Sequence, residues 1–599
     1  MAESPEQAGT PMEELPHPGM VGQLGLVLGA LRGSAVRRTL LSLVIATVLV
    51  LICTAYAQIR LNSWNKPFFD ALSRRDLRDF FYQLGVFGII ISALLILNVM
   101  QRYLVETLKW RLREGLVTDL VSHWMQPRRA FWLAHRGAMG VNPDQRMHED
   151  ARKLCELSGD LGVGLSQATI LFLTFAGILW VLSEDFSFHI AGEDYPIPGF
   201  MLWAAILYAG GGSLLSYWVG SNLIGRNAER YAREADLRFS LVRVNEHLDG
   251  ISLAGGEGDE KRRLWMDLAD VLQATRRLVT GLTNLTWVTA GFGWVTVAAP
   301  ILVAAPLFFA GKITFGGLMM AAAAFTQAQS SLRWFVDNFS IIADWRATLL
   351  RVATFRQALI TEAVRDEGGS RISYVEGEAG AFSIENLEVD SPAGRDALSE
   401  KQVVLKAGER VLVLAAPGTG KTQLFRALAG LWPWGAGTVS APANEAIQYL
   451  PRGTPYLPRG TLREVLAYPL EPRSYSDEAC THALRRMGLE RLLPQLDTRQ
   501  RWERELGQDE QLALAFARLL LQAPPWVLMD DAFGSLDDEL LQRVVDVLGH
   551  ELAHTSLIHI GKPGEGHERL FPRVLHLVKA EGGAVANAAP PRQDATPAP

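Results

Sequence analysis

Long uncharged stretches alternate with charged stretches in the N-terminal part of the chain. A membrane-spanning helix needs about 20 mostly apolar residues. Runs such as LLSLVIATVLVLICTAYAQI, residues 40–59, carry no charge over their full length, which favours a membrane over buried helices of a soluble protein. The pattern predicts six membrane-spanning helices, at roughly 39–59, 81–100, 161–183, 198–220, 281–308 and 315–342.

Lysine and arginine between these segments predict the orientation of the chain. Residues 101–160 carry ten of them and residues 221–280 another ten, whereas 184–197 carries none and is acidic. Cytoplasmic loops are enriched in both residues, so the two basic segments are expected inside and 184–197 outside. The loop 60–80 is also basic and violates this assignment, but the longer segments outweigh it.

The last predicted span contains polar residues that the others lack. Charges in lipid are costly, so Arg333 and Asp337, which lie four residues apart and could pair, must face protein or water if they lie in the membrane. One interpretation is a helix that has already left the membrane by residue 333. The other is a helix that lines a polar pathway, with Gln327, Arg333 and Asp337 as candidate pathway residues.

A different pattern begins after this region. Hydrophobicity falls at 357–380, which predicts a linker, and from 381 to 580 short strands alternate with helices. This pattern is typical of an α/β nucleotide-binding domain. The predicted domains are a transmembrane domain at 25–356 and this nucleotide-binding domain, with disordered tails at 1–24 and 581–599.

The segment VLVLAAPGTGKTQLFRALAG, residues 411–430, has the strand–turn–helix order of a phosphate-binding loop. Backbone N–H groups in the glycine turn and the positive end of the following helix can hold phosphate. Lys421 can reach the β- and γ-phosphates, and the Thr422 hydroxyl can bind Mg²⁺. The pattern normally starts with glycine, but Ala415 stands there. The expected nucleotide-binding residues are Ala415, Ala416, Pro417, Gly418, Thr419, Gly420, Lys421, Thr422 and Gln423.

A second predicted strand, Trp526 to Met529, ends in two carboxylates, Asp530 and Asp531. Asp530 is expected to hold Mg²⁺ opposite Thr422. An apolar strand that ends in Asp-Asp is a weak signal alone, but it is a strong one after a phosphate loop in the same domain.

Composition narrows the classes of function. The net charge of −6 gives no nucleic-acid footprint, and 49% hydrophobic residues agree with a partly membrane-embedded chain. The three cysteines, Cys53, Cys155 and Cys480, form no closely spaced pair, which argues against disulfides or a zinc site.

Several motifs, read together, resemble those of ABC half-transporters, and in detail the SbmA/BacA-like branch, which is related to peroxisomal half-transporters. The resemblance covers about 30 to 580 and rests on NSWNKPFFDAL (62–72), VNPDQRMHED (141–150), AGKITFGGLM (310–319), AGLWPWGAGTV (429–439), LPRGTLREVLAYP (457–469) and LALAFARLLLQAPPWVLMDD (512–531). It implies an exporter-like membrane domain, and a dimer that holds each nucleotide between one phosphate loop and the partner's signature loop.

The sequence departs from this family at positions that the resemblance associates with hydrolysis. Arg452 replaces a glutamine, Asp531 the catalytic glutamate and Lys562 the switch histidine, so these three are the candidate catalytic residues. In the signature loop, Gly507 replaces the serine and Asp509 a glycine, both expected to contact the partner's nucleotide. The aromatic residue that stacks on adenine is missing from LEVDSPAGR, 387–395.

The residues therefore predict binding of ATP and Mg²⁺ with impaired hydrolysis. The favoured function is transport of a peptide-like or hydrophilic to amphipathic solute across the bacterial cytoplasmic membrane, or else the peroxisomal membrane. The expected partners are lipid, the solute and a second half-transporter, in a homodimer or beside a chain with an intact signature, but no nucleic acid. A non-catalytic ATP sensor or scaffold is one alternative. Another is a proton-driven importer with a vestigial ATPase, in which Asp337 carries the proton.

Overall fold

The computed structural model describes residues 19–134, 142–184, 187–190, 193–361, 371–391, 394–415, 418–443, 445–561 and 570–580. They form two compact units: residues 19–129 with 142–361, and residues 130–134 with those from 371 onward. The predicted tails at 1–24 and 581–599 lie mostly outside the described residues. Helix α1, Met20–Gly33, nevertheless begins inside the first of these ranges, because its residues are mostly apolar.

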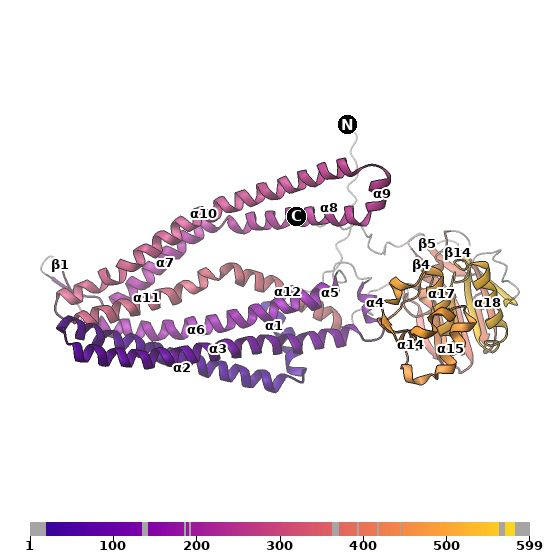
Figure 1. The fold of residues 1–599 in the computed structure, drawn as a ribbon, viewed down its shortest axis with the longest axis horizontal. Coiled ribbons are helices and arrows are strands. Elements are labelled where there is room, and N and C mark those ends of the chain that lie inside the picture. Colours follow the sequence, from indigo (N-terminus) through magenta and orange to yellow (C-terminus); the bar gives the residue numbers. More distant parts are fainter. Residues whose placement is uncertain are drawn as a thin grey trace. The chain divides into compact units, whose positions relative to one another are not determined.

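The first unit is a bundle of long helices (Figure 1). Five helices of the described chain are long and apolar enough to cross a membrane, and each covers all or nearly all of one of the first five predicted spans. They are α2 (Arg37–Arg74), α3 (Leu77–Trp124), the continuous helix Pro143–Leu182 that includes α6 (Ala151–Leu182), α7 (Phe200–Gly220) and α10 (Glu257–Phe309).

The sixth predicted span, 315–342, is divided in the structure. Helix α11, Phe315–Asp337, ends before Asn338, and α12, Phe339–Ile360, follows. Helix α11 packs against α2, α6, α7 and α10, but Gln327, Gln329 and the serines beside them lower its hydropathy, so it is absent from the five membrane candidates among the described residues. That α11 crosses the membrane stays a prediction.

The basic segment 60–80 is almost entirely helical, because α2 and α3 meet in a tight turn. Arg75 has φ 58° and carries the chain from one helix to the next. Near this turn, the Asp70 carboxylate accepts hydrogen bonds from the Thr314 hydroxyl at 3.0 Å and the Gly316 N–H at 2.8 Å. A side chain at Gly316 would collide with the Lys66 carbonyl oxygen. This close contact joins two motifs of the sequence, NSWNKPFFDAL and AGKITFGGLM.

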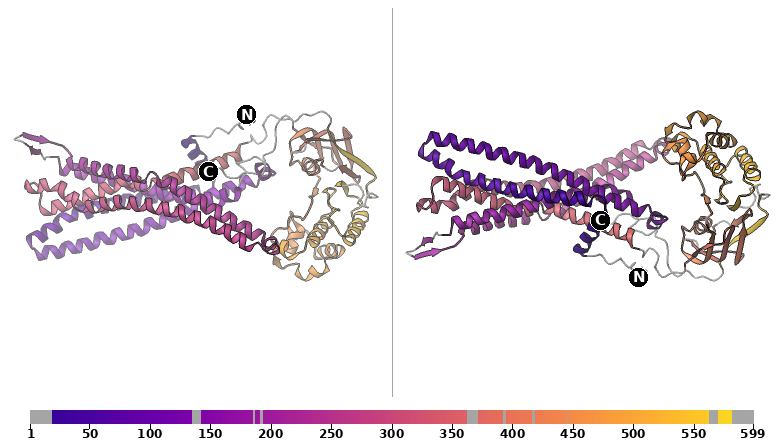
Figure 2. Two further views of the ribbon diagram at one scale, coloured as in Figure 1. Left: turned by 90° about the horizontal axis from the view of Figure 1, so that it is seen from above. Right: turned by 90° about the horizontal axis from the view of Figure 1, so that it is seen from below.

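The predicted external segment 184–197 contains a short antiparallel pair, β1 (Ser187–Ile190) and β2 (Glu193–Pro196). At the other end of α7, the chain continues into an extended hairpin (Figure 2). It consists of α8 (Leu223–Glu246), α9 (Leu248–Leu253) and the N-terminal part of α10.

Ion pairs join the charged ends of the helices in this unit. Arg356 of α12 donates to both carboxylate oxygens of Asp119 on α3, at 2.7 and 3.1 Å, and to the Leu26 carbonyl oxygen of α1 at 2.9 Å. Arg351 binds Asp150 in the same bidentate manner, at 3.0 and 2.8 Å. These pairs hold two carboxylates of the predicted cytoplasmic segment 101–160 between helices.

The second unit is built on a mixed sheet in the order β3-β8-β4-β5-β14-β7-β13-β12-β9, with β6 paired to β4. Strands β9 (Ile447–Leu450), β12 (Trp526–Asp530), β13 (Ser556–Gly561), β7 (Arg410–Ala415) and β14 (Arg573–Lys579) run parallel. The antiparallel part contains β4 (Ala381–Ser391), β5 (Gly394–Leu398), β6 (Gln402–Lys406) and β8 (Gly435–Pro442). Carboxyl ends of parallel strands share one edge, where α/β proteins bind ligands.

Part of the predicted linker 357–380 belongs to these elements instead. Helix α12 continues to Ile360, and Ser373–Gly377 forms β3, which pairs in parallel with β8. The low hydrophobicity of this segment reflects an edge strand that is largely exposed, which a hydropathy profile does not distinguish from a linker.

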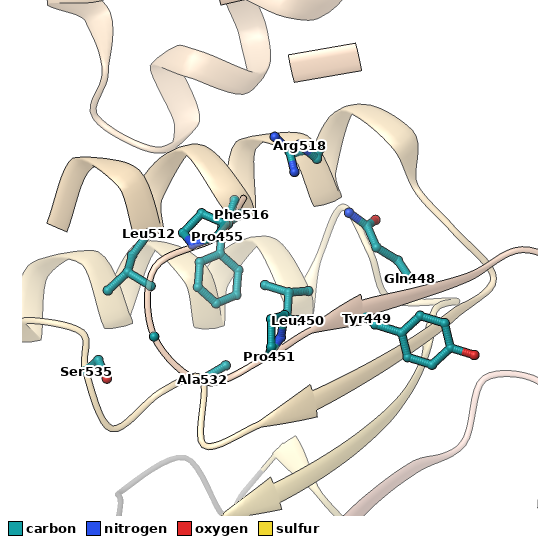
Figure 3. A pocket seen from close by; sticks show the side chains of 12 residues that line it. Gln448, Tyr449, Leu450, Pro451, Pro455, Leu512, Phe516, Arg518, Ala532 and Ser535 are labelled. Atoms are coloured by element: carbon teal, nitrogen blue, oxygen red, sulfur yellow. The ribbon is translucent and has the colours of Figure 1, made fainter. Parts of the chain in front are cut away.

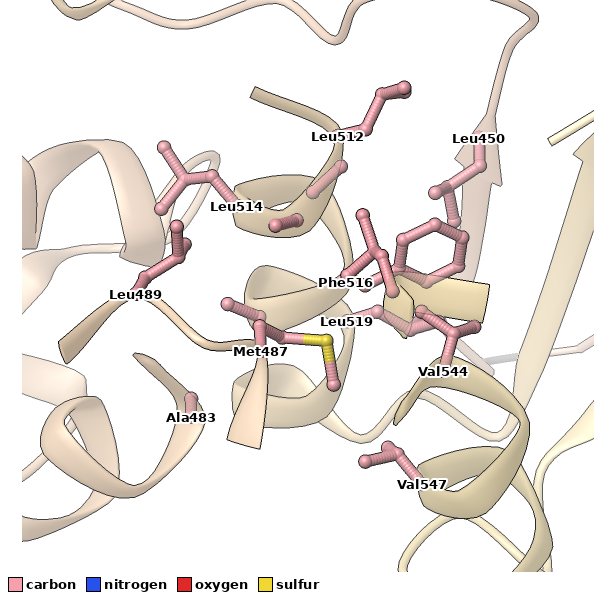
Figure 4. Close-up of a cluster of buried hydrophobic side chains, with 14 of the residues drawn as sticks. Leu450, Ala483, Met487, Leu489, Leu512, Leu514, Phe516, Leu519, Val544 and Val547 are labelled. Carbon is pink, nitrogen blue, oxygen red and sulfur yellow. The ribbon is translucent and has the colours of Figure 1, made fainter. Parts of the chain in front are cut away.

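A hydrophobic core fixes the helices against the parallel strands. Helix α17, Gln508–Gln522, contributes Leu514, Phe516 and Leu519, which pack with Met487 and with Val544 of α18, Asp538–Gly549 (Figure 4). The run LALAFARLLL is apolar except for the buried Arg518, which donates hydrogen bonds to the Val465 carbonyl oxygen, as expected for a helix buried on most sides.

Candidate functional site

The predicted phosphate loop connects β7 to helix α13, Lys421–Leu428. Gly418 has φ 85°, a conformation that favours glycine. Leu424, Phe425, Ala427 and Leu428 bury one face of α13 and thereby fix the direction of its N-terminus. Ala415 ends β7, and Ala416 and Pro417 lie outside the described residues. In the described part of the loop, the left-handed Gly418 and the start of α13 are features that a phosphate cradle uses.

Thr422 and Asp530 meet at the carboxyl edge of the parallel sheet. Strands β7 and β12 flank β13, so the first turn of α13 lies beside the end of β12. The Thr422 hydroxyl donates to Asp530 Oδ2 at 3.1 Å, and Asp530 is only 2% exposed. Burial raises the pKa of the Asp530 carboxyl, while the Thr422 hydrogen bond opposes this rise.

This oxygen pair fits a bound Mg²⁺. A hydroxyl and a carboxylate are hard oxygen ligands, and Mg²⁺ in nucleotide sites uses few such protein ligands together with phosphate oxygens and water. A bound cation would stabilise the ionised form of Asp530 against the cost of burial. When bound, Mg²⁺ would neutralise part of the charge of the phosphates.

Asp531 directly follows in the left-handed region, with φ 50°, and is 4% exposed. Its N–H donates to the Ile560 carbonyl oxygen at 2.7 Å. Arg452 approaches its carboxylate, with 3.6 Å between Nε and Oδ2, although the Arg452 side chain is 63% exposed. The structure thus brings two of the three candidate catalytic residues together, and Lys562 lies outside the described residues.

The loop that carries Arg452 also borders the signature helix. Pro451 and Gly453, on either side of Arg452, line a small pocket with Leu512 and Phe516 of α17 and with Ala532, which follows Asp531 (Figure 3). A movement of this loop would therefore change the packing of both the signature helix and the residues next to Asp531.

The signature residues form the N-terminus of α17. The Gly507 N–H donates to the Glu510 carboxylate at 3.1 Å, and Glu510 also pairs with Arg491. Asp509 lies in the first helical turn, where the helix dipole favours a carboxylate. Within the described residues, no hydrogen bond or ion pair joins Gly507 or Asp509 to the phosphate loop of the same chain.

A residue that the sequence analysis overlooked, Asp396 of β5, reaches the phosphate loop. Its Oδ2 atom accepts hydrogen bonds from the Gly420 N–H and from the Ser391 hydroxyl, both at 3.0 Å. The sequence signal was present, because Asp396 and Leu398 are the inward positions of an alternating strand, and a carboxylate at an inward position needs an explanation.

The pathway residues predicted on α11 belong to the other unit. Arg333 donates to Asp337 at 3.1 Å, and the Gln327 carbonyl oxygen accepts from Ser330 and Ser331. Asp344 of α12 pairs with Lys153 of α6 at 3.1 Å.

A helical bundle with membrane-length helices, followed by a phosphate-loop domain, defines an ATP-binding membrane protein. Residues 31–309 match the family described as "ABC transporter transmembrane region 2", and residues 398–534 match "ABC transporter". Two relatives are similar in sequence to this chain over most of its length.

The "Inner membrane ABC transporter ATP-binding protein YddA" of Escherichia coli (strain K12) is 25% identical, over 87% of this chain and 91% of its own length. The "ABC transporter D family member 2, chloroplastic" of Arabidopsis thaliana is 25% identical, over 81% and 76%. A solved structure, "Structure of a bacterial Atm1-family ABC exporter with ATP bound", has a TM-score of 0.68 at 16% identity, covering 91% of this chain and 94% of that chain.

The chain belongs to the ABC half-transporters, in which a membrane domain and an ATP-binding domain share one polypeptide. It has the exporter fold of the Atm1 family and is a multi-pass membrane protein. Such half-transporters form dimers in a bilayer, and the function that this architecture fits is membrane transport.

Proposed function

We propose that this chain binds Mg-ATP as one half of a dimeric transporter, and that its homodimer hydrolyses ATP far more slowly than a transporter with an intact signature. The observation that carries the binding part is the 3.1 Å hydrogen bond between Thr422 and Asp530 beside the phosphate-loop helix. This pair supports the proposal, because a hydroxyl and a carboxylate are oxygen ligands of the kind that Mg²⁺ uses in nucleotide sites.

The altered residues support the slow rate. The dimer of the family would bring Asp509 of one chain toward the γ-phosphate bound by the other. Two like charges about 4 Å apart repel by about 4 kcal/mol at an effective dielectric near 20. Gly507 offers no hydroxyl to offset that repulsion.

The base that would orient the attacking water is also altered. Asp531 is one methylene shorter than glutamate, and Arg452 holds a cation 3.6 Å from its carboxylate. Position 562 supplies lysine in place of the histidine of the family.

For the solute, we infer a peptide-like or hydrophilic to amphipathic compound, in line with the SbmA/BacA-like resemblance. Arg333 and Asp337 on α11 are the proposed polar residues of its pathway. The bacterial cytoplasmic membrane is the proposed location, consistent with the inner-membrane relative.

One alternative is a non-catalytic protein that binds ATP as a signal or scaffold, favoured by the same altered residues. The other is a proton-driven importer, for which the exposed Asp337 carboxylate would be the carrier. A polar residue on a membrane helix is unfavourable in free energy, and a sensor has no need for such a residue. This consideration favours transport.

The decisive experiment is ATPase activity and solute flux of the purified full chain in lipid nanodiscs and proteoliposomes. Solute flux with bound ATP and no proton gradient supports the proposal. Flux that requires a proton gradient and is lost in Asp337→Asn supports the importer. Nucleotide binding without any flux, over a panel of peptides and polar vitamins, supports the sensor.

Native mass spectrometry of the same sample tests the assembly. Two copies, or one copy beside a related chain, are expected. An active monomer would contradict a nucleotide site shared between chains.

A further inference from the structure

The carboxylate of Asp396 occupies a backbone donor of the phosphate loop. The Gly420 N–H, immediately before the helix that starts at Lys421, points at Asp396 Oδ2 over 3.0 Å. A Cβ placed on Gly420 would lie 2.9 Å from the same oxygen, so the carboxylate lies directly against the loop. N–H groups at this place in a phosphate loop are those that cradle phosphate oxygens.

Asp396 is held against the loop although its surroundings offer its carboxylate few hydrogen-bond donors. It is 1% exposed, and the Ser391 hydroxyl, which donates to its Oδ2 at 3.0 Å, holds it from the neighbouring strand. Its other oxygen, Oδ1, is buried without a hydrogen-bond partner among the residues that the structure describes. A buried carboxylate oxygen without a donor is destabilising, so its position here needs a reason beyond stability.

Asp396 differs in kind from the other carboxylates on the same hairpin. Asp390 and Glu388 pair with Arg395, at 2.6 and 3.4 Å, and their charges are thereby compensated. Asp396 is on the inward side of β5 and has a loop amide and a hydroxyl instead of a cation.

We propose that Asp396 is an internal competitor for the phosphate cradle. In the resting site its carboxylate takes the place of a phosphate oxygen at the Gly420 N–H. A nucleotide has to displace it, and its negative charge then lies close to the bound phosphates. The affinity for phosphate groups is consequently set low by a side chain of the protein itself. This inference rests on the proposed binding of Mg-ATP.

Two substitutions separate the parts of this effect. Asp396→Val removes both the charge and the acceptor and suits a buried β-strand position. Asp396→Asn removes the charge but keeps an oxygen that can accept from Gly420. The matched control is Asp390→Asn, a carboxylate on the same hairpin that is bound to Arg395 and has no recorded contact with Gly420.

The measurement is the dissociation constant of the full chain in nanodiscs for a fluorescent ATP analogue with Mg²⁺. Displacement of this analogue by ATP and by inorganic tripolyphosphate is measured in addition. Asp396→Val should tighten ATP binding by about 10- to 100-fold, the range for a hydrogen bond to a charged group. Asp396→Asn should give a smaller gain, and Asp390→Asn no change. Tripolyphosphate should gain by a similar factor, because the competition concerns phosphate and not the nucleoside.

The experiment separates a failure of this inference from a failure of the proposed ATP binding. Unchanged or weaker binding in Asp396→Val, with a normal wild type, overturns the inference and leaves ATP binding intact. A gain for ATP without one for tripolyphosphate also overturns it, because Asp396 then acts on the nucleoside. Binding in Asp396→Val but not in the wild type supports it strongly.

If no variant binds nucleotide, and Lys421→Ala equals the wild type, ATP binding and this inference fail together. Thermal unfolding without nucleotide verifies the fold of each variant. If Asp396→Val unfolds early, the nearly isosteric Asp396→Asn decides alone, with tighter binding in support and unchanged or weaker binding against.

Discussion

The nucleotide site has a side that binds phosphate and a side that is associated with hydrolysis. We propose that the residues of the second side depart from the family much more than those of the first. On the binding side, α13 begins at Lys421 directly after the glycine turn, and its Thr422 hydroxyl is hydrogen-bonded to Asp530. On the hydrolysis side, we propose that Asp531, Arg452 and the signature residues depart from the chemistry of the family. The contrast teaches that holding a phosphate depends mainly on backbone geometry, whereas cleaving it depends on particular side chains.

The largest expected effect comes from restoring the hydrolysis side as a set. Gly507→Ser, Asp509→Gly, Asp531→Glu and Lys562→His together should raise the ATPase rate of the homodimer by on the order of 10²–10³, the loss that one positioned electrostatic contact causes. We claim no more than this, because such effects are not additive. The measurement is phosphate release in nanodiscs at saturating Mg-ATP.

The restored variant carrying Lys421→Ala in addition is the control, and it should return to background. The contrast between the two sides would be wrong if the wild-type homodimer already turned over several ATP per second. Arg452 and Lys562 would then form a working alternative arrangement.

A smaller effect is expected on the binding side. Lys421→Ala should weaken binding of Mg-ATP by about 10- to 100-fold, because it removes a charge-assisted contact of about 1.5–3 kcal/mol to phosphate. Fluorescent-nucleotide binding measures the change, and Lys421→Arg, which keeps the charge, should lose less. An unchanged dissociation constant in Lys421→Ala would show that the loop does not hold phosphate through this residue.

Much of the fold could be predicted from the sequence because its signals are long or repeated. The uncharged runs predicted the five helices that satisfy membrane length and composition, and GTGKT with its flanking strand and helix indicated the phosphate loop. The family and the fold class were confirmed by the family matches and by the similarity to a solved exporter.

Other features depend on contacts that a linear pattern does not contain. The sequence predicts a linker where strand β3 lies, because its pairing partner β8 is far along the chain. The role of Asp70 at the start of α11 likewise joins residues that are distant in sequence. Asp396 was overlooked because its significance comes from the Gly420 N–H, which only the folded hairpin brings within 3.0 Å.

Removing the cation beside Asp531 should change the rate only slightly. Arg452 is mostly exposed and 3.6 Å from the carboxylate, and exposed pairs contribute at most about 1 kcal/mol. Arg452→Gln alone is therefore expected to raise the ATPase rate by less than about fivefold. Arg459→Gln, an arginine beyond the same loop, serves as the control. A fall of more than tenfold in Arg452→Gln would instead make Arg452 part of the hydrolysis machinery.

The smallest effect is expected from Asp531→Glu alone, within about twofold of the wild-type rate. The longer side chain brings a carboxylate closer to an attacking water, but Asp509 still opposes closure of the site over a γ-phosphate, by an energy of about 4 kcal/mol. The backbone also disfavours the exchange. Asp531 has φ 50°, a region that aspartate adopts more readily than most residues, so glutamate loses some of the local stability that aspartate provides.

Phosphate release by Asp531→Glu, measured beside the fully restored variant, tests this expectation, and Asp538→Glu on α18 controls for lengthening a carboxylate in the same domain. If the ATPase rate of Asp531→Glu equals that of the restored variant, the missing methylene at position 531 accounts for the whole deficit in ATPase rate. The signature residues Gly507 and Asp509 would then be without effect on hydrolysis, and the contrast between the two sides of the site would narrow to a single carboxylate at the end of β12.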